Sequence, residues 1–216
     1  MADWLSARIR PVAGQWDDVG QGAPVITLPG FCANDRSMEQ MRRNLRAAGF
    51  RARGWHMGAN YGARADTLHR IDARVQSVAD REGRAVHLVG WSLGGVFARE
   101  YAKQHPAAVA SVVTMGSPFS GDPRANHAWR LYRMVAGHSV DNPPIAWSPL
   151  PKPPVPTFAL WSPRDGVIAP PCAHGQDDER DVVVELACTH MGFAYHADAI
   201  AAVVDCLLQA QMVVAP

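Results

Sequence analysis

The feature that most constrains this 216-residue chain is an apolar run that leads into a Gly-x-Ser-x-Gly motif. Residues 86–89 form the run, the motif occupies Gly90–Gly94, and no helix breaker interrupts Val96–Gln104. This order predicts a buried strand, a tight turn and a helix. A strained turn of this kind lifts the serine hydroxyl clear of the sheet, and the glycines add no side chain that would block strand or helix. We therefore predict that Ser92 is a nucleophile.

Composition describes an ordinary globular chain. Hydrophobic residues make up 48% and charged residues 19%, and the formal net charge of +1 argues against a nucleic-acid partner. The length fits a single domain over residues 1–216. Acidic Asp3 stands where an export signal would carry positive charge, and no apolar run approaches the roughly 18 residues of a membrane span. We expect a cytoplasmic protein without stable membrane insertion, and the oligomeric state stays open.

The rest of the chain alternates between strand-like and helix-like patterns. Six strands are predicted, at residues 24–28, 50–57, 86–89, 111–115, 156–161 and 181–186. Apolar residues at helical spacing lie between most of them, and a closing helix carries Ile200, Val203 and Leu207. This alternation predicts an α/β fold with a mostly parallel sheet covered by helices on both faces. Functional side chains in such a sheet lie beyond the carboxyl ends of the strands.

A serine nucleophile needs a histidine base, and the base needs a carboxylate that orients it. Asp165 follows the predicted strand at 156–161, and His190 follows the predicted strand at 181–186. Both therefore lie at strand ends, where a base and its partner are needed. The nearest rival to His190 is His196, six residues further on in the closing helix.

In this order and placement, the segments resemble the α/β-hydrolase superfamily, whose triad runs serine, acid, histidine along the chain. Residues 90–95, 114–118, 165–167 and 190–192 are most similar to segments of small bacterial lipases and esterases. Two departures stand out: Pro29-Gly30 replaces the His-Gly of many relatives, and the first two strands of the full-sized fold are missing or vestigial. The resemblance implies a trimmed α/β-hydrolase fold of about six parallel strands.

The resemblance implies a serine hydrolase that cleaves carboxylic esters, with a small ester carrying an apolar acyl group as its partner and no cofactor. Backbone amides of Leu93 and Phe31 are expected to form the oxyanion hole, and Phe31, Trp91, Trp129 and Tyr132 to contact substrate. The same machinery serves thioesterases and acyltransferases, because fold and triad do not fix the substrate. A catalytically silent protein that holds a ligand in the same pocket is the alternative from another class.

Other polar clusters are interpreted as structural. His174 with the acidic run at 177–179 could suggest a metal loop, but charge runs in loops are usually solvated, and we expect no metal. The four cysteines lack the spacing of a zinc site. Cys172 and Cys188 follow neighbouring strands, so their pairing stays open, although a cytoplasmic location argues against a stable disulfide.

An insertion of about residues 119–155 interrupts the alternation between two core strands, and we expect it to form a small cap over the site. Within it, Trp129 and Tyr132 fall on one helical face that would suit an acyl chain. A helix that only shields the core would show the same stripe. The proline-rich segment at 148–154 would keep the return path extended and stiff.

A stiff cap predicts an esterase for short to medium acyl chains rather than an interface-activated lipase. The measurement compares p-nitrophenyl esters of increasing chain length with emulsified triglyceride, in the wild type and in Trp129→Ala. A preference for long chains, or a jump in rate as substrate passes from monomer to emulsion, would contradict this expectation.

Overall fold

The structure, a computed structural model, describes residue 16 and residues 18–122, 144–145 and 147–214. Its strands are β1 (Pro24–Leu28), β2 (Arg51–Gly54), β3 (Val86–Trp91), β4 (Val109–Met115), β5 (Thr157–Trp161) and β6 (Val182–Glu185). Its α-helices are α1 (Glu39–Ala47), α2 (Thr67–Glu82), α3 (Leu93–Gln104), α5 (Pro170–His174) and α6 (Ala197–Val214), with short 3-10 helices η1 (Asp35–Met38), η2 (Pro106–Ala108) and η4 (Met191–Ala194). The strands form one sheet in the order β2-β1-β3-β4-β5-β6, in which each pairing is parallel.

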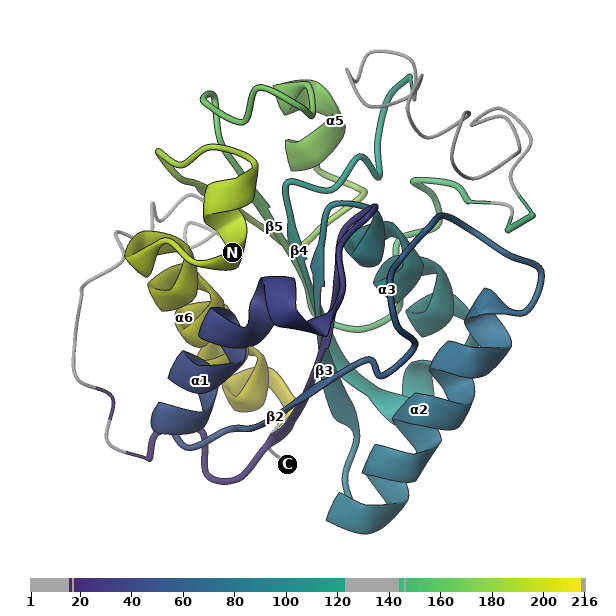
Figure 1. Cartoon of the computed structure of the whole chain (residues 1–216), viewed down its shortest axis with the longest axis vertical. Helices are drawn as coiled ribbons and strands as arrows, with labels where there is room; N and C mark the ends of the chain where they lie inside the picture. Colours follow the sequence, from purple (N-terminus) through teal and green to yellow (C-terminus); the bar gives the residue numbers. More distant parts are fainter. Residues whose placement is uncertain (1–15, 17, 123–143, 146, 215–216) are drawn as a thin grey trace.

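Helices cover both faces of this sheet (Figure 1): α1 and α6 lie on one face, and α2 and α3 lie on the other. Neighbouring residues of a strand point to opposite faces. In β3, Val89 packs in the core beneath α1 and α6, whereas Leu88 packs in the core beneath α2 and α3. Two apolar faces explain why these strands appear in the sequence as continuous apolar runs. The predicted α/β fold, with a parallel sheet between two helix layers, is confirmed.

Strand β2 is shorter than the segment 50–57 that the sequence predicts. It ends at Gly54 because the Asp35 carboxylate accepts the next two backbone N–H groups, from Trp55 at 3.0 Å and from His56 at 3.1 Å. Those groups are therefore not available to a neighbouring strand. His56 also has a φ of +58°, which an extended strand does not have. A side chain at the start of η1 thus fixes where β2 stops.

The closing helix α6 buries the face that the sequence predicts. Ile200, Val203 and Leu207 are each at most 3% exposed, and they pack against the same face of the sheet as α1. Among the helices of the described residues, none combines the length and the apolar character needed to cross a membrane.

The predicted cap of residues 119–155 connects β4 to β5. Residues 123–143 and 146, which include Trp129 and Tyr132, lie outside the described residues, so the cap and its substrate contacts stay predictions.

The described ends of this insertion are both attached to helix α3. The Arg99 guanidinium lies over the Phe119 ring, 4.2 Å from its centroid, and donates to the Pro149 carbonyl at 3.1 Å. One turn further along α3, the Lys103 ammonium donates to the Ser148 carbonyl. The helix that begins next to Ser92 therefore also fixes where the insertion leaves and rejoins the core.

His87 is a structural residue of β3, as expected for a histidine inside a predicted strand. Its ring is buried, and Nδ1 lies 2.7 Å from the Ser111 hydroxyl oxygen on β4. Burial, and to a smaller extent the positive charge of Arg84, lowers the pKa of His87 to about 4. The imidazole is therefore neutral in the folded protein at neutral pH.

This pKa predicts an acid-dependent loss of stability. Because the folded-state pKa lies below the ordinary value of about 6.5, the unfolded chain takes up the proton at higher pH than the folded chain. The contribution of His87 is complete above about pH 6.5 and falls by about 3 kcal/mol as the pH drops toward 4. Urea unfolding between pH 7 and pH 4.5 measures it. The free energy of unfolding of His87→Gln should fall less over this pH range than that of the wild type. His69→Gln, at an exposed site, is the control. An equal fall in wild type and His87→Gln would contradict the prediction.

Candidate active site

Ser92 lies at the corner between β3 and α3, in a backbone conformation with φ +53° and ψ −125°. Such a conformation is strained for a residue with a side chain and persists only where its surroundings hold it. The Ser92 N–H donates to the Met115 carbonyl at the end of β4 at 2.9 Å, and the Ser92 carbonyl accepts from the Gly95 N–H at 3.0 Å. Hydrogen bonds on both sides therefore hold the corner, as the motif predicts.

Two glycines make this corner sterically possible. A Cβ on Gly90 would lie 2.4 Å from the Cα of Gly95, and a Cβ on Gly94 would lie 2.2 Å from the Leu28 carbonyl oxygen. Carbon atoms do not approach backbone atoms so closely. Strand β3, the start of α3 and the end of β1 therefore meet through their backbones, and a side chain at either glycine would force them apart.

The structure brings Asp165 and His190 together at the same edge of the sheet. His190 Nδ1 lies 2.9 Å from Asp165 Oδ2, and the backbone N–H of His190 donates to the backbone carbonyl of Asp165 at 2.9 Å. The other carboxylate oxygen of Asp165 accepts from the N–H groups of Val167 at 2.9 Å and Ile168 at 2.6 Å. Both side chains are buried. Asp165 is thus fixed by the backbone of its own loop, with one oxygen left to orient the imidazole.

Trp91 links the serine to the histidine. It directly precedes Ser92, its indole N–H donates to the His190 carbonyl at 3.0 Å, and its ring centroid lies 5.6 Å from that of His190. Only 3% of Trp91 is exposed. The sequence predicts substrate contact for this ring, which stays a prediction, but misses its support of His190. That support depends on a contact between residues 99 positions apart, which no local pattern indicates.

The two predicted oxyanion donors lie on either side of this corner. Leu93 is the first residue of α3, so the helix itself does not bond its N–H, and the helix dipole there favours negative charge. Phe31 lies in the loop between β1 and η1, directly after Gly30. A Cβ on Gly30 would lie 3.1 Å from the Cβ of Ser92, so this loop passes beside the serine.

Gly116, directly after β4, lies close to the Asp165 carboxylate. Its φ is +52°, and a Cβ there would lie 2.8 Å from Asp165 Oδ2 and 2.7 Å from the ring of Phe193. Gly116 lies in the segment 114–118 that resembles hydrolases, but the resemblance implies no role for it. Its place directly after the predicted strand at 111–115 was the one feature of the sequence that could have pointed to a role near the site.

The competing residues have structural partners or lie at the surface. His196 is exposed, with Nδ1 3.7 Å from the Asp198 carboxylate. In the loop before β6, Asp177 pairs with Arg180 at 2.9 Å. Across the part of the chain that the structure describes, no three His, Cys, Asp or Glu residues are grouped so that they could hold a metal ion.

The cysteines show no disulfide bond between Cys172 and Cys188. Burial raises the pKa of the Cys188 thiol to about 11, so that thiol is protonated and unreactive at neutral pH although it lies two residues from His190.

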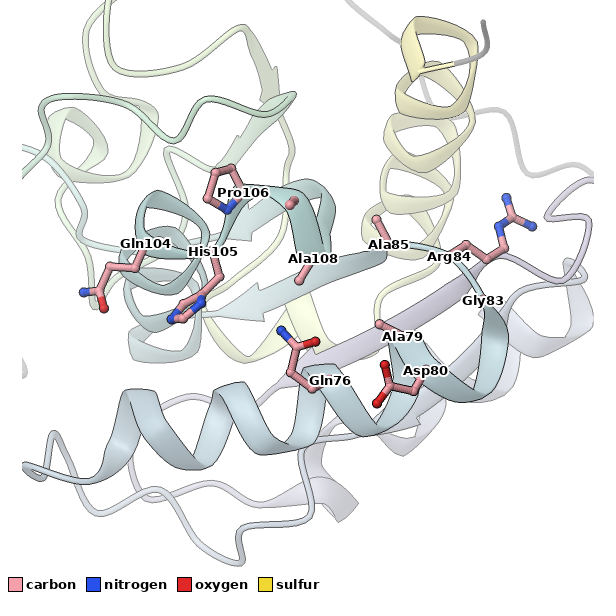
Figure 2. A pocket seen from close by; sticks show the side chains of 11 residues that line it. Gln76, Ala79, Asp80, Gly83, Arg84, Ala85, Gln104, His105, Pro106 and Ala108 are labelled. Carbon is pink, nitrogen blue, oxygen red and sulfur yellow. The ribbon is translucent and has the colours of Figure 1, made fainter.

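A cleft of about 600 Å³ lies at the other end of the strands, where β3 and β4 begin (Figure 2). The end of α2 and the segment around η2 line it, with Gln76, Arg84 and His105 among the lining side chains. Ala85 in its wall directly precedes β3, whereas Ser92 directly follows β3. The six residues of this strand separate the two places by about 20 Å. The cleft is therefore distinct from the cluster around Ser92.

This architecture is similar to that of known proteins. The sequence model of the alpha/beta hydrolase fold matches residues 25–148. No curated protein matches the chain.

Three solved structures show the similarity in three dimensions. The alpha/beta hydrolase enzyme MGS-MChE2, from a metagenome of Mar Chica lagoon sediments in Morocco, has 20% identity, a TM-score of 0.62, and coverage of 86% of this chain and 90% of its own. The pyrethroid hydrolase PytH has 17% identity, a TM-score of 0.60, and coverage of 87% and 97%. The Paleococcus ferrophilus monoacylglycerol lipase has 16% identity, a TM-score of 0.60, and coverage of 88% and 96%. With a parallel sheet, a serine at a strained strand-to-helix corner, and a family match over more than half its length, the chain belongs to the α/β-hydrolase fold family.

Proposed function

We propose that this protein is a serine hydrolase that cleaves carboxylic esters through Ser92, His190 and Asp165. The observation that carries the proposal is the buried hydrogen bond of 2.9 Å between His190 and Asp165, linked through Trp91 to the strained corner that presents Ser92. A carboxylate that fixes one ring nitrogen of a histidine leaves the other nitrogen to serve as a base. Membership of the α/β-hydrolase fold family supports a hydrolase.

In the proposed reaction, the Ser92 oxygen attacks the ester carbonyl carbon while Nε2 of His190 takes the hydroxyl proton. The carbonyl oxygen becomes an oxyanion, which the N–H groups of Leu93 and Phe31 stabilise. Collapse of this intermediate breaks the ester bond, and His190 returns the proton to the leaving alcohol. Water then attacks the acyl-enzyme with the same base, releasing the acid and restoring Ser92. The Asp165 side chain keeps the imidazole in the required tautomer through its bond to Nδ1.

Two structural neighbours, named a hydrolase and a lipase, support an ester substrate for this chain. The alternative is a binding protein that keeps the fold without the chemistry. A serine-reactive organophosphonate separates the two, because only an activated serine reacts with it. Labelling of the wild type that Ser92→Ala abolishes supports the enzyme, and a folded wild type that is not labelled favours the binding protein.

The triad predicts large and selective losses of activity. Ser92→Ala and His190→Ala should each lower the turnover of p-nitrophenyl butyrate by several orders of magnitude, because triad members act as a unit. Asp165→Asn should lower it by about 10³ to 10⁴, since the neutral amide no longer enforces the tautomer. The matched controls are His196→Ala and Asp198→Asn, which make the same changes at the exposed pair nearby. Inactivation by a control variant, with its triad counterpart active, would overturn the assignment.

Gly116 provides a test of the geometry around the acid. Gly116→Ala should displace Asp165 or Phe193 and so reduce turnover, because its Cβ would meet both. Gly166→Ala is the control: Gly166 also has a positive φ, of +74°, but a Cβ there would meet no atom within 4 Å. Both variants carry backbone strain, and only the first carries a clash. Turnover and melting temperature are measured for each; equal activities would show that the contact with Asp165 is unimportant.

A further inference from the structure

Asn60 is a buried polar residue that the triad does not use. It lies in the loop between β2 and α2, and only 1% of it is exposed. Its side-chain amide donates to the Pro29 carbonyl at 2.8 Å, and its side-chain oxygen accepts from the Gly62 N–H at 3.2 Å. A buried amide with both ends bonded holds its partners in one arrangement, because a lost partner would leave a buried polar group unsatisfied.

The backbone of Asn60 bonds to the same loop. Its carbonyl accepts from the Cys32 N–H at 2.7 Å, and its N–H donates to the Ala33 carbonyl at 2.8 Å. Together with the side-chain bond to Pro29, Asn60 contacts the loop on both sides of Phe31. One residue therefore supplies three of the hydrogen bonds that shape the segment Pro29–Ala33.

This segment is a tight turn. The Ala33 N–H donates to the Gly30 carbonyl at 3.1 Å, and Cys32, the third residue of the turn, has a φ of +58°. A positive φ at this place is typical of type II turns and is unfavourable for a residue with a side chain. The bond from Cys32 to Asn60 offsets that strain. The acceptor is the backbone carbonyl of residue 60, so its position depends on the bonds that the Asn60 side chain makes to Pro29 and Gly62.

The other side of the segment rests against the nucleophile. A Cβ on Gly94 would lie 2.8 Å from the Pro29 carbonyl oxygen, and a Cβ on Gly30 would lie 3.1 Å from that of Ser92. The segment is thus held between Asn60 on one side and the start of α3 on the other. Movement of the segment would move the Phe31 amide relative to Ser92.

We propose that Asn60 is a positioning residue, which fixes the Pro29–Ala33 turn so that the Phe31 amide faces the oxyanion formed at Ser92. This inference rests on the proposed function, and it names the structural source of one half of the oxyanion hole. It assigns Asn60 no contact with substrate. The effect of Asn60 is therefore expected in the transition state rather than in substrate binding.

The experiment uses Asn60→Asp, which keeps the size of the side chain but replaces the donor to Pro29 with a carboxylate oxygen. Asn60→Ala is the second variant, which removes the donor without adding charge. We expect kcat for p-nitrophenyl butyrate, per active site titrated with organophosphonate, to fall by about 100-fold with little change in KM, as misplacement of a catalytic group by about 1 Å does. Inhibition by butylboronic acid, which forms a tetrahedral anion on the serine, should weaken by the same factor.

Two control variants separate this role from general destabilisation. Asn44→Asp removes a bond of the same kind, from an Asn amide to the Gln40 carbonyl at 2.9 Å within α1. Val78→Ala removes core volume in α2, far from the turn in the fold. Both should keep kcat per titrated site, whatever their melting temperatures. If Val78→Ala lowers kcat as much as the Asn60 variants, or if boronate inhibition is unchanged in the Asn60 variants, the positioning role is wrong.

The outcome for Ser92 separates the two proposals. If Ser92→Ala abolishes hydrolysis while both Asn60 variants keep full kcat, the positioning role fails and the proposed function stands. If the wild type hydrolyses no ester and reacts with no organophosphonate, the proposed function fails, and the positioning role fails with it.

Discussion

The backbone contact between β3 and the start of α3 is the constraint on which the rest of this structure depends. A Cβ on Gly90 would lie 2.4 Å from the Cα of Gly95, and a Cβ on Gly95 would lie 2.0 Å from the Ser117 hydroxyl oxygen, so neither position admits a side chain. This contact holds Ser92 in a conformation that its own side chain disfavours. The same contact directs the first N–H groups of α3 toward the carboxyl edge of the sheet, where a negative charge on a reacting oxygen would form. The strain at Ser92 and the direction of these N–H groups are thus consequences of one packing arrangement.

The parallel sheet then determines which loops meet this serine. Strands β5 and β6 are neighbours, with Trp161 paired to Glu185, so the loops that follow them leave the sheet side by side. The Ser162 hydroxyl in the first loop donates to the Cys188 carbonyl in the second at 2.6 Å, buried from solvent. This bond joins the two loops before the chain reaches Asp165 and His190. Asp165 and His190 are therefore brought together by bonds between their loops as well as by their own side chains.

Helix α3 connects this edge of the sheet with the insertion. It begins next to Ser92, and its Arg99, two turns later, contacts Phe119 at the start of the insertion and Pro149 near its end. Arg99 is buried, which lowers its pKa to about 10, but it remains charged at neutral pH. Separating a buried cation from its partners costs free energy. The insertion is thus attached at both ends to the helix that directly follows Ser92.

Much of this architecture was determined by the sequence alone. The apolar runs of β1 and β3 and the helical spacing of α2 and α6 are local patterns, and local physics makes them strands and helices. The order of Ser92, Asp165 and His190 after predicted strands could be read in the same way, since a parallel sheet gathers its strand ends at one edge.

Tertiary structure alone decided the features that depend on distant partners. Strand β2 ends at Gly54 because the carboxylate of Asp35, the first residue of η1, accepts the N–H groups that follow. Trp91 supports His190 across 99 residues, and Asn60 bonds to Pro29 across 31. A hydrogen bond between loops depends on where the whole fold places both ends, and no periodicity along the chain records that placement. The sequence could therefore predict that Ser92, Asp165 and His190 follow strand ends, whereas the residues that hold them in position became visible only in the folded chain.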